Sequence, residues 1–219
     1  MLFRSMSSMN DNARYMSLKA TTSSAGLMGI DNIDLSVTDF TVAMNRGIDT
    51  EWSAHFADHP FSIATGEESI SLNFDARNGT QTKAHGTMNL NLGEFFSVEG
   101  NLSVDSFTDT INVSDGTDDI LSNILTIGAS DINAFVGSSD QTTGINLSNL
   151  DFELAIIKPT DTEDDRTFTS LAARADSAGF RGIDDLTLEG NDIFVAMNLS
   201  SDDNAFADFS QKPLNIDIG

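Results

Sequence analysis

Apolar and polar residues alternate along most of this chain with a period of two. In residues 88–92 methionine and leucine alternate with asparagine, and the same period recurs in residues 33–37, 40–44, 150–156 and 193–197. Such alternation predicts strands with one buried and one solvent-facing side, as in antiparallel sheets. Glycine, asparagine, aspartate and serine fill the breaks between these segments, which is typical of turns. The pattern predicts an all-β fold with essentially no helix.

The same pattern places the strands along the chain. Gly93, Gly100 and Gly190 interrupt apolar segments and predict bulges or tight corners. Residues 118–125 have the spacing of a single short turn of helix. Strands are expected near residues 17–22, 28–37, 39–46, 51–57, 69–76, 83–92, 95–107, 109–114, 124–137, 144–157, 167–175, 180–189 and 191–199.

A long segment of the chain occurs twice. Residues 17–66 return as residues 170–219, an offset of 153 residues with no insertion or deletion, and 21 of the 50 aligned pairs are identical. Self-similarity at a fixed period indicates a repeat architecture. We therefore expect residues 66–218 to be one complete 153-residue unit, residues 1–65 the C-terminal part of a preceding unit, and Gly219 the start of a further copy. The chain is then an excerpt of an elongated β-rod, either solenoid-like or a long antiparallel meander.

The two copies share the motif S-A-G-x-x-G-I-D-x-[IL]-x-L, then V-A-M-N and, later, a proline. In one interpretation the aspartates and asparagines of this motif bind ions at a junction between units. In the other, which ordinary turn chemistry favours, the glycines form turns and each aspartate caps a turn through backbone N–H groups. The repeated positions are Gly26, Gly29, Asp31, Asn45 and Pro60 in the first copy and Gly179, Gly182, Asp184, Asn198 and Pro213 in the second.

Charge and composition narrow the class of protein. The chain has 34 acidic and 11 basic residues, a net charge of −23, so nucleic acid and anionic membranes are not expected partners. Cysteine is absent, which excludes disulfides and thiolate metal sites. No apolar segment approaches the roughly 18 residues of a membrane span. The acidic residues lie in turns. The nearest candidate for a calcium site is a weak one, formed by Asp115, Asp118 and Asp119, and the sequence has no EF-hand pattern.

The sequence carries no recognisable catalytic constellation. His55 and His59 align with Asp208 and Lys212 in the other copy, so the repeat does not keep them. His85 lies beside Lys83 in an expected strand or turn. Nucleophile-elbow, phosphate-loop and dinucleotide motifs are absent from the sequence. We therefore do not expect an enzyme or a cofactor other than calcium. A carbohydrate-active enzyme on a β-solenoid and a calcium- or glycan-binding β module remain as alternatives.

Three segments carry a resemblance: "LTIGASDINAFVG" at 125–137, "INLSNLDFELAIIKP" at 145–159 and the repeated segment that begins at Ser170. They resemble the tandem units of very large bacterial extracellular, adhesin-like repeat proteins, which alternate "NAFVG"-type strands with "GLxGIDGLTLSG" segments. The resemblance implies a non-catalytic stalk, filament or spacer module, secreted or at the cell surface. Its expected partners are neighbouring copies of the unit and surface glycans. The abundance of aspartate fits a marine or saline host.

Overall fold

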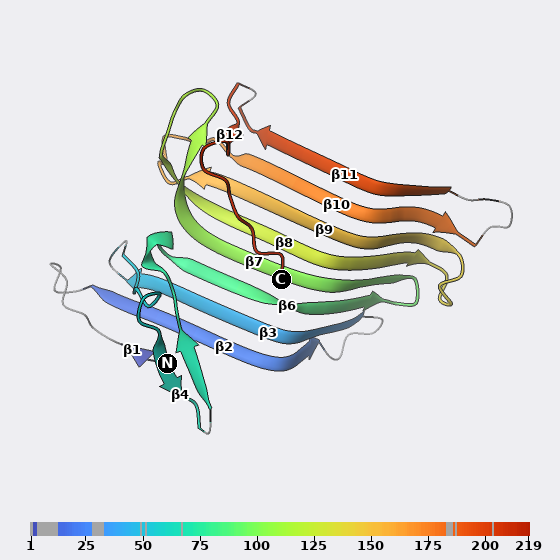
Figure 1. Cartoon of the computed structure of the whole chain (residues 1–219), viewed down its shortest axis with the longest axis horizontal. Helices are drawn as coiled ribbons and strands as arrows, with labels where there is room; N and C mark the ends of the chain where they lie inside the picture. Colours follow the sequence, from blue (N-terminus) through green and yellow to red (C-terminus); the bar gives the residue numbers. More distant parts are fainter. Residues whose placement is uncertain are drawn as a thin grey trace.

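One antiparallel sheet organises the chain (Figure 1). The computed structural model describes residues 2–3, 13–27, 33–48, 50, 52–66, 68–182, 186, 188–202 and 204–219. In sheet order its strands are β1 (Leu2–Phe3), β2 (Arg14–Leu27), β3 (Ile33–Ile48), β6 (Gln81–Leu92), β7 (Phe96–Val113), β8 (Ile120–Gly137), β9 (Gly144–Pro159), β10 (Phe168–Arg181) and β11 (Leu188–Ser200). This arrangement confirms the all-β class and is an open antiparallel meander with β1 and β11 at its two ends.

Two segments that do not belong to the meander cross one face of this sheet (Figure 1). The first crossing segment, residues 52–75, contains the hairpin of β4 (Phe61–Ala64) and β5 (Ser69–Leu72) and is followed by a 3₁₀ turn at Ala76–Asn78. The second, residues 201–219, contains β12 (Ala207–Asp208), which pairs with β7.

Apolar side chains fix each crossing segment to the sheet. The first packs Phe56, Phe61 and Ile63 on the cluster around Ala43, and the second packs Phe209, Leu214 and Ile216 on a larger cluster. The positions correspond pair by pair under the 153-residue offset. The members of the larger cluster are Ile111, Val113, Ile124, Ala155, Ile157, Phe168, Ala205 and Ala207.

The two copies of the repeat also have the same strand register. Ser17 of β2 pairs with Asn45 of β3, and Ser170 of β10 pairs with Asn198 of β11. Strand β1 pairs with β2 in the register in which β9 pairs with β10. In the order of the sheet, β10 lies six strands beyond β2. The sequence repeat is therefore also a repeat of the backbone pairing, although the boundaries of the unit stay a prediction.

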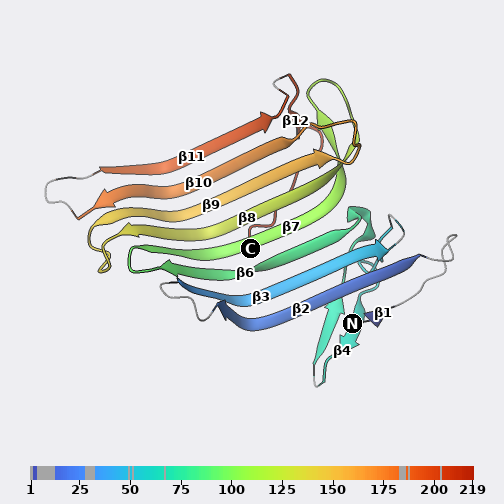
Figure 2. The ribbon, with the colours of Figure 1, turned by 180° about the vertical axis from the view of Figure 1, so that it is seen from behind.

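Figure 2 shows the sheet from the side opposite to the crossing segments. Because successive side chains of a strand point to opposite faces, residues that pair with one another share a face. One such row is uninterrupted by polar residues from β2 to β11. It consists of Ala20, Val42, Ala84, Val104, Ile127, Leu154, Leu171 and Met197.

Several local predictions are wrong. Residues 120–125 of the predicted helical turn belong to β8, and the two strands expected at 95–107 and 109–114 are one strand, β7. Residues 52–57 form no strand, because Phe56 packs on the sheet rather than within it. No helix in the described ranges is long and apolar enough to span a membrane.

Two of the three glycines that predict bulges or tight corners lie at such irregularities, and the third does not. Gly93 lies in the turn between β6 and β7 with a φ of 58°, and the register of β7 and β8 shifts at Gly100, whose φ is 151°. Gly190, in contrast, pairs regularly with Ala178. The left-handed residue of β11 is Asp192, two positions later, with a φ of 52°. Its counterpart in the first copy, Asp39, has the same φ.

Candidate functional site

Asn45 connects the first crossing segment to the sheet. Its Oδ1 accepts a hydrogen bond of 2.7 Å from the Ser17 hydroxyl of the neighbouring strand, and its Nδ2 donates one of 2.7 Å to the carbonyl of Ala54. The Asn45 residue is 0% exposed. A buried amide needs such partners, because an unsatisfied polar group loses its hydration without compensation.

Asn198 makes the corresponding bonds in the second copy. Its Oδ1 accepts from the Ser170 hydroxyl at 2.9 Å, and its Nδ2 donates to the carbonyl of Ala207 at 2.9 Å. All three residues lie 153 positions after Ser17, Asn45 and Ala54. We call each set of three residues a latch, because it holds a crossing segment against the strand that precedes it.

The latches differ in their exposure to solvent. Strand β3 lies between β2 and β6, whereas β11 has a single neighbour, β10, among the described strands. Asn45 is accordingly buried and Asn198 exposed. The bond from the serine hydroxyl is therefore exposed to water in the second copy and partly buried in the first, whereas the bond to the alanine carbonyl is partly buried in both.

The other repeated positions are placed as follows. Gly26 and Gly179 lie inside β2 and β10 rather than in turns, and a Cβ there would approach the carbonyl oxygen of the next strand to 3.3 and 2.9 Å. Gly182 has a φ of 91° at the bend after β10. Pro60 and Pro213 are exposed, and Pro60 directly precedes β4. The remaining three, Gly29, Asp31 and Asp184, lie outside the described residues.

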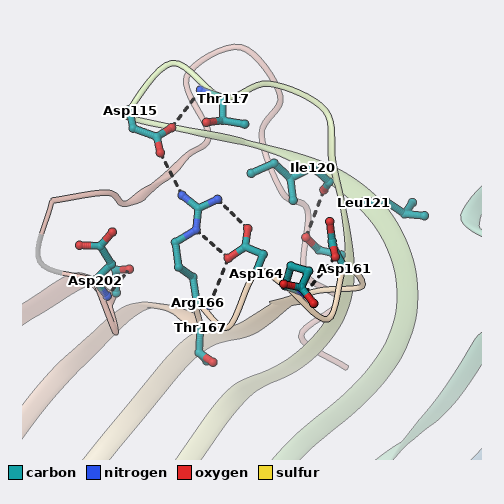
Figure 3. Close-up of polar contacts among 12 residues, drawn as sticks. Asp115, Thr117, Ile120, Leu121, Asp161, Asp164, Arg166, Thr167 and Asp202 are labelled. Atoms are coloured by element: carbon teal, nitrogen blue, oxygen red, sulfur yellow. Dashed lines mark hydrogen bonds and ion pairs between the residues drawn. The ribbon is translucent and has the colours of Figure 1, made fainter.

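Aspartate carboxylates in the acidic turns accept hydrogen bonds from nearby donors. Arg166, in the turn before β10, donates to Asp164 from Nε at 2.8 Å and Nη2 at 2.6 Å, and to Asp115 from Nη1 at 2.9 Å (Figure 3). Its guanidinium also lies 5.6 Å from the centroid of the Phe168 ring, a cation–π contact. This cluster joins the β9–β10 turn to the β7–β8 turn.

The opposite charges in this cluster favour the ionised form of each side chain. Side-chain hydrogen bonds from Arg166 hold the pKa of Asp164 below its ordinary value, and the Thr117 hydroxyl and backbone, followed by Arg166, lower the pKa of Asp115. The same bonds raise the pKa of Arg166. Nearby opposite charge and hydrogen bonds to a carboxylate both favour its charged form.

The candidate calcium ligands do not form a cluster. Asp115 is paired with Arg166, and the backbone N–H of Asp119 donates to the side chain of Asn112. Within the described ranges, no group of three or more acidic or histidine side chains is placed to hold a metal ion, Asp118 included.

The histidines do not form a common site with one another. His55 Nε2 lies 2.9 Å from Asp58 Oδ2, and its Nδ1 accepts from the backbone N–H of Ala76 at 3.2 Å. This places His55 in the first crossing segment beside the 3₁₀ turn. Asp208 occupies its position in the second copy, where its carboxylate accepts from the backbone N–H of Ser210.

Sequence reasoning did not find the partners of the two asparagines. A signal was present, since the alanine nine residues after each V-A-M-N motif is also identical in the two copies. An alanine that is identical in both copies does not by itself indicate that its backbone carbonyl accepts a hydrogen bond.

Comparisons of the chain with protein-family models, characterised proteins and solved structures find no match. The resemblance to extracellular repeat units therefore stays a prediction.

Proposed function

We propose that this chain is a non-catalytic structural module of a large secreted or cell-surface bacterial protein, in which each 153-residue unit adds six strands to one continuous sheet. The observation that carries this proposal is the recurrence, at the same offset as the sequence repeat, of strand register, latch and apolar anchors. A unit related to its neighbour in this way is suited to make an elongated rod.

The dimensions of such a rod follow from sheet geometry. Neighbouring strands are about 4.8 Å apart, so six strands would advance the sheet by about 29 Å per unit. The strands themselves run across the rod. The excess of acidic residues favours solubility and limits association through charge repulsion.

The test is a protein in which residues 67–219 are added once more after Gly219, since Gly219 occupies the place of Gly66 in the repeat. Small-angle X-ray scattering should show one rigid particle that is longer by about 29 Å along one axis. The control carries the same added residues in permuted order, 140–219 before 67–139, so composition and charge are unchanged. A flexible two-body particle from the unpermuted protein would contradict the proposal.

A further inference from the structure

The outer edge of β11 presents an unusual surface. Its neighbour among the described strands is β10 alone, so its backbone groups on the other side have no ladder partner in the described structure. Large apolar residues are exposed along it, with Leu188 at 66%, Phe194 at 64% and Leu199 at 52%. An exposed strand edge with apolar side chains is a template for a further strand.

The repeat shows what lies at the equivalent edge of the first copy. Strand β3, the counterpart of β11, pairs on that side with β6, and Val42 lies opposite Ala84. Five β3 residues in this ladder are identical to their counterparts in β11. Among them are Val42, Met44 and Leu35, whose counterparts are Val195, Met197 and Leu188.

Charge also favours a strand of the β6 kind at this edge. Strand β6 (Gln81–Leu92) contains no acidic residue and carries Lys83 and His85. Strand β11 contains Glu189 and Asp192. A second β11 strand at the same edge would bring these acidic side chains together within a chain of net charge −23, which like-charge repulsion disfavours.

We propose that the edge of β11 binds an antiparallel strand with the β6 residue pattern, supplied by the next copy of the repeat unit in the same polypeptide. The register follows from the β3–β6 ladder. The residue equivalent to Ala84 lies opposite Val195, that equivalent to Thr82 opposite Met197, and that equivalent to Leu90 opposite Leu188. This inference rests on the proposed function, and it names the strand and the register through which the sheet continues.

The first experiment adds only residues 67–92 after Gly219, so that the added segment supplies one β5-like and one β6-like strand. Hydrogen exchange should then slow at least about tenfold at the outward-facing amides of β11, because they gain ladder hydrogen bonds. A control adds the same residues in scrambled order. Equal protection in both proteins, or in neither, overturns the proposal.

The second experiment tests the register by cross-linking. The chain has no cysteine, so Val195→Cys can be combined with Ala84→Cys in the added segment alone. Paired residues on neighbouring strands fall within the Cα separation that a disulfide allows. This pair should oxidise at least about tenfold faster than a control that combines Val195→Cys with Met88→Cys of the added segment. Equal or reversed rates overturn the register.

Two further outcomes separate the alternatives. If protection of β11 in the unextended chain rises with protein concentration, a second copy of the chain occupies the edge, and the assigned occupant is wrong. If the protein with a whole added unit is longer by about 29 Å but the β11 pairings fail, the sheet continues through another strand. In that case the proposed function survives and this inference does not.

Discussion

The two latches allow one hydrogen-bonded arrangement to be tested in two environments of the same molecule. We expect Asn45→Ala to destabilise the protein more than Asn198→Ala. Each substitution removes the same two hydrogen bonds, one from a serine hydroxyl and one to an alanine carbonyl. The difference between them arises because β3 has a neighbouring strand on both sides, whereas β11 has one on a single side among the described strands.

The size of each effect follows from hydrogen-bond energetics. Two lost bonds at about 1 kcal/mol each, plus the penalty for partly buried Ser17 and Ala54 groups left without their partner, give about 2–4 kcal/mol for Asn45→Ala. At Asn198 water can replace the exposed bond to the Ser170 hydroxyl, whereas the Ala207 partner is buried, so we expect a smaller loss of about 1–2 kcal/mol.

Urea unfolding followed by far-UV circular dichroism measures both free energies of unfolding, provided the m-value is unchanged. Asn191→Ala, also on β11, controls for the change in strand propensity. Equal losses for Asn45→Ala and Asn198→Ala would refute the reasoning, because burial would then have no influence on the latch.

Two other predictions concern acid stability and the bulge in β7. The pKa of Asp164 is lower in the folded than in the unfolded protein, so its pair with Arg166 stabilises the fold above about pH 4 and loses this effect as the pH falls further. Thermal unfolding between pH 7 and pH 3 should therefore show a shallower acid decline for Arg166→Met than for the parent protein, and identical slopes would count against the cluster. Gly100→Ala should destabilise by about 1–3 kcal/mol, because the new Cβ would lie 2.8 Å from the Cα of Ile132. Gly190→Ala, whose Cβ would meet nothing closer than 3.5 Å, should be nearly neutral in the same urea assay, and a comparable loss would contradict this account.

The sequence was sufficient for the features that repeat or alternate. Period-two alternation predicted the all-β class, and the 153-residue offset alone aligned Asn45 with Asn198. Both signals are local or internal to the sequence, so they need no knowledge of which strands are neighbours.

The crossing segments could not be predicted in the same way. Residues 52–57 have strand-like alternation, yet Phe56 packs on the face of the sheet. Local sequence does not distinguish a side chain that is buried within a ladder from one that is buried on top of it. Likewise, the ion pair of Asp115, a candidate calcium ligand in the sequence, could not be predicted because its partner, Arg166, is 51 residues away in sequence.

The second crossing segment has a mechanical consequence. A force that pulls perpendicular to the strands would separate a sheet without crossing segments one strand at a time, because the hydrogen bonds of one strand pair can break before those of the next. Residues 201–219 begin at the end of β11 and reach β7, where β12 pairs with it and Lys212 contacts Asp109. This covalent strap spans β8, β9 and β10, so strands β7 to β11 would resist such tension as a braced block rather than as a series of separable strands.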